Sequence, residues 1–242
     1  MSLGLHILEH LSVVGAERAA RHSEPGLNAR VLAVKSFQQR RFRHTYADLL
    51  NSTRYRPAAT FFLEELYGPD DFSQRDAQFA RVVPAMVRLF PAEIVGTVAT
   101  LSELHALSEQ LDTAMGRALT STSVSTADYI VAWRASGTPS RRSEQIDLTL
   151  RVASSLDGLT RRSLLRNSLR LMRRPANAAG LGELQRFLER GFDNFKAMNG
   201  AREFISLVET RERTLASALF GTSLAGPACD QQDVFALLPE SP

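Results

Sequence analysis

Apolar residues recur every three or four positions along nearly the whole chain, a spacing that places them on one face of an α-helix. Glycine, proline and capping residues separate these stretches, as they do at helix ends rather than in β-hairpins. Long alternating runs of β-branched residues are missing, so we expect an all-α protein. Among the helices that this pattern predicts are those over residues 3–20, 27–51, 91–119, 126–136, 183–197 and 201–220.

The residues at the ends of these stretches support the same assignment. Pro57 opens a short helix that Gly68 and Pro69 end, which follows the preference for proline in the first turn and glycine just past the last. Ser125 and Asp128 could cap the helix that follows them. We expect about eight or nine helices packed as one irregular bundle over residues 1–221. The remainder, 222–242, is predicted to be a flexible tail whose Val-Phe-Ala-Leu-Leu stretch could dock on the domain.

Composition places the chain among ordinary globular proteins. It has 242 residues, of which 44% are hydrophobic and 23% charged. The single cysteine, Cys229, cannot form an internal disulfide, as expected in a reducing compartment. No signal peptide and no run of about 18 apolar residues occurs, so we expect a cytoplasmic protein that does not enter a membrane. The net charge of +3 does not by itself indicate nucleic acid.

One motif carries a resemblance to a known family. Residues 61–67 read FFLEELY, within YRPAATFFLEELYGPDDFSQRDAQFARVVPAMVRLFP. Together with ELHALSEQLDTAM around His105, this segment resembles an uncharacterised bacterial family known as the FFLEELY-motif proteins. The resemblance covers residues 54–115 and implies no activity, because none is established for that family.

The two acids of this motif, Glu64 and Glu65, point in directions about 100° apart on a helix whose other side carries Phe62, Leu63 and Leu66. They cannot both face the core. In one interpretation both are solvent-facing acids on a core helix. In the other, one is a buried carboxylate that serves as a base or a metal ligand.

A second candidate site lies on the predicted helix over 91–119. His105, Glu109 and Asp112 fall on one face of it, at the edge of an apolar stripe. This face could hold a divalent metal together with Glu64 or Glu65 from another helix, as in bundles whose ligands project into the core. The alternative is a histidine held by a carboxylate one turn away at the rim of the core.

The same histidine allows a haem interpretation. Residues 96–105, GTVATLSELH, are similar to the haemoglobin β-chain segment that ends at the proximal haem histidine. That similarity implies that His105 would bind iron. It covers ten residues, and the flanking sequence does not continue as a globin would.

Near the start of the chain, His6, Glu9 and His10 fit the H-x-x-E-H pattern, in which two histidines bind zinc and the glutamate activates water. No third ligand helix is evident after it. A pair of surface histidines is the alternative.

An arginine-rich face is predicted on a helix over 160–174. Arg162, Arg166, Arg170 and Arg173 form a stripe opposite apolar residues. Such a stripe could bind phosphate, nucleic acid or an acidic partner. The absence of aromatic residues for base stacking argues against nucleic acid. The alternative is a solvated face paired with acids elsewhere.

Motifs for dinucleotide, nucleotide and serine-hydrolase sites, such as G-x-G-x-x-G, are missing. We therefore expect a non-enzymatic interaction or regulatory module, with an unknown protein partner or self-association. The alternative is a sensor or oxidoreductase that binds a small ligand, haem or a divalent metal at a site centred on His105.

Overall fold

The computed structural model describes residues 2–65, 73–221 and 237–239, without the side chains of residues 65, 73–78, 163 and 164. These residues form eleven α-helices and no strand, which confirms the all-α prediction with more helices than the eight or nine expected. The helices are α1 (Leu3–Ser23), α2 (Leu27–Thr45), α3 (Ala47–Asn51), α4 (Arg56–Glu65), α5 (Ser73–Leu89), α6 (Ala92–Ala118), α7 (Thr126–Ser136), α8 (Pro139–Thr160), α9 (Ser163–Ala178), α10 (Gly182–Ala197) and α11 (Arg202–Phe220).

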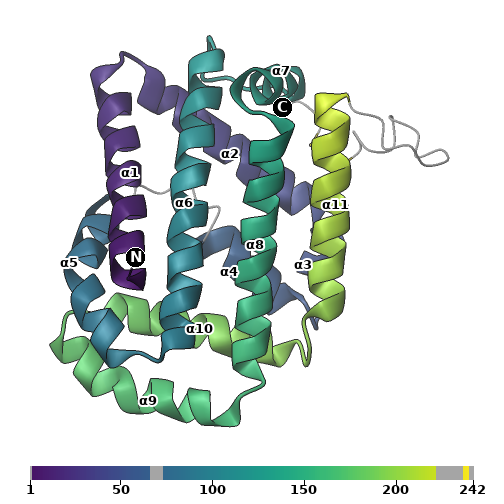
Figure 1. Cartoon of the computed structure of the whole chain (residues 1–242). Helices are drawn as coiled ribbons and strands as arrows, with labels where there is room; N and C mark the ends of the chain where they lie inside the picture. Colours follow the sequence, from purple (N-terminus) through teal and green to yellow (C-terminus); the bar gives the residue numbers. More distant parts are fainter. Residues whose placement is uncertain (1, 66–72, 222–236, 240–242) are drawn as a thin grey trace.

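Four long helices form the body of the molecule. α1, α6, α8 and α11 stand side by side in that order, and α2 crosses behind α6 and α8 (Figure 1). α9 and α10 lie across the lower end, while α7 packs near the upper ends of α6 and α11. No helix in the described part of the chain is apolar over a length that would cross a bilayer.

Several helix ends follow from local chemistry. At the start of α7 the Ser125 side chain accepts from the Asp128 N–H while the Asp128 carboxylate accepts from the Ser125 N–H, so the predicted cap is present and takes the form of a capping box. Gly221 ends α11 in the left-handed conformation, at a φ of 68° that favours glycine. The predicted helix over 27–51 is broken at Tyr46 into α2 and α3.

The apolar half of the FFLEELY motif belongs to the core. Phe61, Phe62 and Leu63 are buried, and Phe62 packs against Phe195 and Phe204. Glu64 is exposed, whereas the Glu65 side chain and residues 66 and 67 lie outside the described residues. Phe61 and Phe62 of the motif therefore hold α4 against α10 and α11.

The end of the chain also meets the core. Leu238 is buried in a cluster with Val34 and Phe37, and the Thr45 hydroxyl donates to the Leu237 carbonyl oxygen at 2.8 Å. This agrees with docking through the apolar stretch before the chain end. Residues 222–236 and 240–242 lie outside the described residues, so the domain boundary at 221 stays a prediction.

Glycine at position 116 lets α2 approach α6 closely, because a Cβ there would lie 2.5 Å from Val31 Cγ2 and 3.3 Å from the Val31 backbone nitrogen. Gly116→Ala is expected to lower the free energy of unfolding by about 1–3 kcal/mol, because neither the β-branched side chain of Val31 nor its backbone can move away from the new methyl group without strain. Gly96→Ala on the same helix is the control: nothing lies within 4 Å of its Cβ position. Because alanine has a higher helix propensity than glycine, Gly96→Ala should raise the free energy of unfolding by about 0.5–1 kcal/mol. Urea unfolding of both variants measures the difference, and an equal response would contradict the close approach.

Candidate functional site

A line of polar side chains on α2 faces the interior. Lys35, Gln38 and Arg41 follow one another at three-residue spacing, so they share one side of the helix. Lys35 Nζ lies 2.6 Å from Glu109 Oε1 of α6, and Gln38 Nε2 donates to Asp112 Oδ1 at 2.9 Å. Arg41 Nη1 donates to Glu212 Oε1 of α11. A polar layer therefore runs through the bundle from α1 to α11.

Glu109 is the centre of the first part of this layer. Its carboxylate is 2.6 Å from both Lys35 Nζ and Arg21 Nη2, and 3.5 Å from Arg18 Nη2. The Arg21 guanidinium is held in addition by the Thr113 hydroxyl at 2.8 Å. Burial alone would raise the pKa of Glu109, but the charges of Lys35 and Arg21 outweigh it and lower that pKa to about 2. The carboxylate is therefore ionised and committed to its ion pairs.

The other predicted members of this site lie close by with different surroundings. His105 is half-buried, and Arg18 Nη2 lies 3.5 Å from its Nε2 atom. Asp112 is buried, and burial raises the pKa of its carboxyl. Among the described residues, no three His, Cys, Asp or Glu side chains are grouped closely enough to hold a metal ion. The exposed Glu64 is thus not brought into such a group with the acids of α6.

A cavity of about 50 Å³ lies between α2, α4, α7, α8 and α11. Its half-buried lining residues come mainly from α8 and α11, so it approaches the surface between these two helices. The apolar end includes Ala153 in the second half of α8, Phe204 and Val208 near the start of α11, and Phe62, which stacks on Phe204. The polar end is formed by Gln38, Arg41, Tyr46, Tyr129, Trp133, Arg142, Gln145 and Glu212.

The polar end contains a buried arginine, Arg142, that lacks a counter-ion among the described residues. Arg142 is 1% exposed, and its guanidinium carbon lies 3.7 Å from the centre of the Trp133 ring. Nη1 donates to Gln145 Oε1 at 3.0 Å, whereas Nε and Nη2 have no hydrogen-bond partner. No carboxylate in the described part of the chain forms an ion pair with it. A buried cation without a counter-ion is costly, and burial accordingly lowers the pKa of Arg142.

The start of α8 places this arginine. The Thr138 side chain accepts from the Arg141 N–H and Pro139 occupies the first turn, so the helix begins just before Arg142. Gly137 leaves room for the guanidinium, since a Cβ there would lie 3.2 Å from Arg142 Nε. Sequence reasoning missed Arg142 and Trp133. The available signal was register, because counting back from the buried Leu148 by threes reaches Gln145 and then Arg142.

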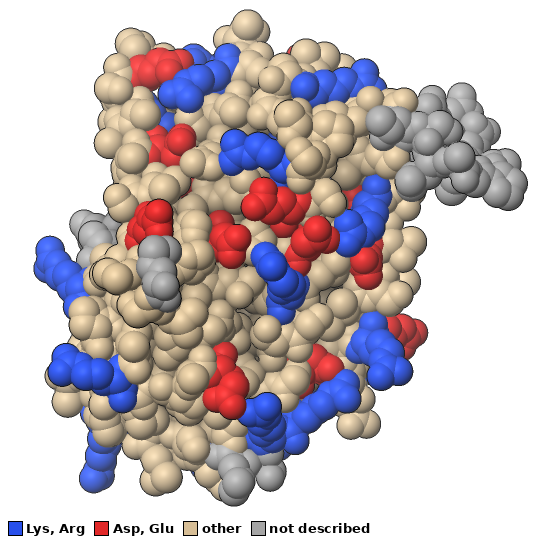
Figure 2. Space-filling view, in the orientation of Figure 1, with Lys and Arg blue, Asp and Glu red and all other residues tan. Residues whose placement is uncertain are grey.

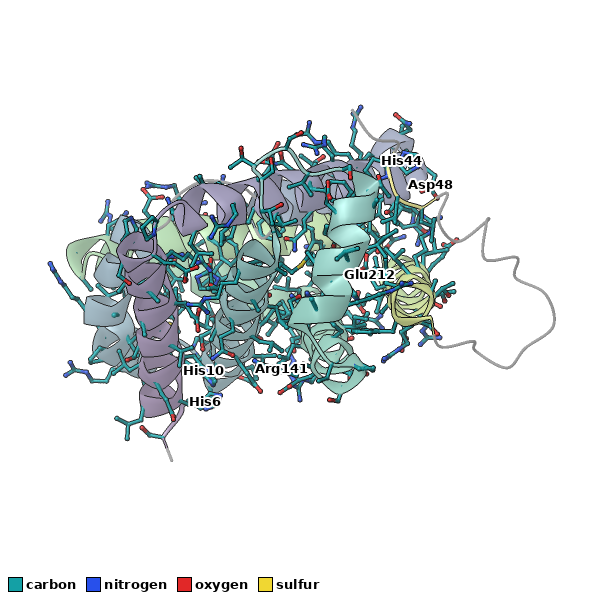
Figure 3. The ribbon with its side chains drawn as sticks, turned by 90° about the horizontal axis from the view of Figure 1, so that it is seen from above. His6, His10, His44, Asp48, Arg141 and Glu212 are labelled. Atoms are coloured by element: carbon teal, nitrogen blue, oxygen red, sulfur yellow. The ribbon has the colours of Figure 1, made fainter. Side chains whose placement is uncertain are left out.

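The cavity contains one acid, Glu212, whose carboxylate accepts from Arg41 and also from the Tyr46 hydroxyl at 2.6 Å. Figure 3 shows Glu212 projecting from α11, while His6 and His10 lie together on α1 at the other side of the molecule. The rings of these two histidines are 4.4 Å apart, and His6 Nε2 lies 3.9 Å from Glu103 Oε2. The H-x-x-E-H pattern is thus remote from the cavity.

The predicted arginine face is largely paired with acids. Arg162 binds Glu93 of α6 at 2.7 Å, and Arg166 makes two hydrogen bonds to Asp193 of α10 at 2.8 and 2.7 Å. Arg173 likewise binds both oxygens of Glu189 of α10. Arg170 is exposed, without an ion pair to any described carboxylate. On the face seen in Figure 2, basic and acidic side chains are interspersed.

Comparison with known proteins adds one finding. A family model described as a domain of unknown function, DUF8198, matches residues 17–225. The chain belongs to the DUF8198 family. Every residue that lines the cavity falls within the DUF8198 match, whereas His6 and His10 precede it. Neither the curated proteins nor the solved structures include a match to the chain.

Proposed function

We propose that this DUF8198 protein binds a small organic molecule in the cavity between α2, α4, α7, α8 and α11, and acts as a non-enzymatic regulatory module. The observation that carries the proposal is the two-ended lining. An apolar end beside a few converging polar groups is typical of small-molecule sites. Because five helices contribute to the lining, a bound ligand would tie α8 and α11 to α2, which gives binding a structural consequence.

Two features favour this cavity over the sites predicted around His105 and on α9. Glu109 is held by Lys35, Arg21 and Arg18, so it is poorly suited to receive a metal. Arg166 and Arg173 form ion pairs with acids of α10. These pairs favour a role in holding α9 against α10 over a role in binding a partner. Arg142, which lines the cavity, keeps two donors, Nε and Nη2, without a hydrogen-bond partner.

Thermal unfolding in the presence of small molecules tests the proposal. A panel of acetamide, acetate, butanol, butyramide and butyrate is added in millimolar steps. At least one member should raise the melting temperature with a saturable dependence on concentration, because a ligand that binds only the folded state stabilises it. At a hundredfold excess over Kd the gain is about 2.7 kcal/mol.

Filling the cavity supplies the comparison. Ala153→Leu adds bulk to the apolar end and should abolish the rise, and Thr149→Leu is a second filling variant if the first is poorly folded. Ser154 is exposed on the same helix, so Ser154→Leu should keep the ligand-induced rise in melting temperature. No rise with any compound, or an equal rise in the filled variants, would overturn the proposed function.

A further inference from the structure

We infer that the ligand is a short-chain organic carboxylate, and that Arg142 receives its carboxylate group while the apolar end of the cavity receives its carbon chain. This inference rests on the proposed function and names the chemical class of the ligand. It is carried by the charges around the cavity, by the edge of the guanidinium that remains unused, and by the size of the space.

The charged side chains at the polar end include two arginines and one acid, so one arginine lacks a counter-ion there. Of the two arginines at the polar end, Arg41 is paired with Glu212, which is further satisfied by Tyr46. Arg142 has no such acid among the described residues. Asp112 is near enough to influence Arg142, but its carboxyl is bound by Gln38, and burial raises its pKa and so disfavours its charge. An anion entering the cavity would supply the missing counter-ion.

The unused donors form a matching pair. Nε and Nη2 lie on the same edge of a guanidinium, and this edge accepts the two oxygens of a carboxylate in parallel hydrogen bonds. The third nitrogen, Nη1, is already bound to Gln145. Stacking on the Trp133 ring fixes the plane of the group, so the edge is oriented before a ligand arrives. Trp133, which lines the cavity, adds a further buried donor, because its Nε1–H has no hydrogen-bond partner.

The size limits the carbon chain. A cavity of about 50 Å³ is well below the roughly 150 Å³ of an engineered cavity that holds benzene. Acetate, with four heavy atoms, is nearer to this size than butyrate, which has as many heavy atoms as benzene, so the end of a butyrate chain would reach toward the opening between α8 and α11. Longer chains would have to extend toward the opening between α8 and α11.

Matched ligands test the inference on the unaltered protein. Isothermal titration compares butyrate with butyramide, which has nearly the same shape and no charge, and acetate with acetamide. Butyrate is expected to bind about tenfold or more tightly than butyramide, the ratio typical of a charge-assisted hydrogen bond over a neutral one. Sodium chloride at the same ionic strength serves as the reference.

Variants then assign the effect to Arg142. Arg142→Met should reduce the ratio of butyrate to butyramide affinity to about one, since it removes the charge and both donors. Arg141→Met is the matched control, because Arg141 is exposed on the same helical turn and bonds Gln110 instead. It should keep the ratio of the parent protein.

The outcomes separate the two proposals. Equal binding of butyrate and butyramide to the parent protein, or a ratio unchanged by Arg142→Met, would overturn the carboxylate assignment while the cavity remains a ligand site. The absence of binding by all four compounds, together with no thermal shift across the panel described above, would overturn the proposed function itself. The comparison of ligands on the parent protein stands even if the methionine variant fails to fold.

Discussion

Replacing Glu109 by glutamine is expected to lower the free energy of unfolding by about 3–5 kcal/mol, because it leaves buried cations without their common carboxylate. Lys35 and Arg21 both lie 2.6 Å from this group, and the Glu109 side chain is 3% exposed. Chemical denaturation of the variant measures the loss. Glu24→Gln, at an acid 41% exposed that pairs with Arg30 and Arg117, should cost less than about 1 kcal/mol.

The same carboxylate sets the response to acid. Its pKa in the folded protein, about 2, lies below the ordinary value of 4.5, so its contribution is complete above pH 4.5 and is lost as the pH falls toward 2. The difference corresponds to about 3 kcal/mol. Asp112 has the opposite sign, since its raised pKa favours the folded state in acid. Subtracting the stability curve of Glu109→Gln from that of the parent isolates the Glu109 contribution. A difference that does not change between pH 5 and pH 2 would contradict the ion-pair centre.

Two buried arginines should respond in opposite ways to the same substitution. Arg142→Met is expected to leave the free energy of unfolding of the ligand-free protein within about 1 kcal/mol of the parent or to raise it, since it removes a buried charge that lacks a counter-ion. Arg41→Met should cost about 3–5 kcal/mol, because Arg41 is paired with Glu212 and its loss leaves a carboxylate that is only 15% exposed without its cation. Urea unfolding of both variants without ligand gives the comparison.

The expected difference depends on whether each guanidinium has a counter-ion. It does not depend on burial, because both side chains are nearly inaccessible to solvent. The Trp133 stack and the bond to Gln145 work against the gain at position 142, which is why we expect a small change rather than a large stabilisation. A loss of 3 kcal/mol or more in Arg142→Met would show that the charge is already compensated within the folded protein, and a ligand anion would then not be needed.

Much of the helical layout could be predicted from the sequence, because helix periodicity and caps are local signals. The predicted span 126–136 and its predicted cap at Ser125 and Asp128 agree with α7 as observed. The break at Tyr46 could not be predicted in the same way. The hydroxyl of Tyr46 bonds Glu212, 166 positions later, and nothing beside residue 46 marks that contact.

The candidate site was only partly accessible to such reasoning. Glu109 and Asp112 do share a buried face with the half-buried His105, since one helix fixes their spacing. What the spacing could not show is that Lys35, Arg21 and Arg18 from two other helices meet Glu109. Arg142 was missed because an arginine is normally assigned to the surface, and its burial depends on Trp133 and on the glycine at position 137.

Fluorescence of the chain's single tryptophan tests the ligand site most directly. Trp133 lies in the cavity wall. Because the chain has no other tryptophan, the emission reports on the cavity alone. Titration with butyrate is expected to change the emission saturably, with the midpoint found by calorimetry, and Arg142→Met should weaken the response by about tenfold or more. Emission that stays constant while butyrate binds by calorimetry would place the ligand elsewhere and contradict the assignment of the cavity.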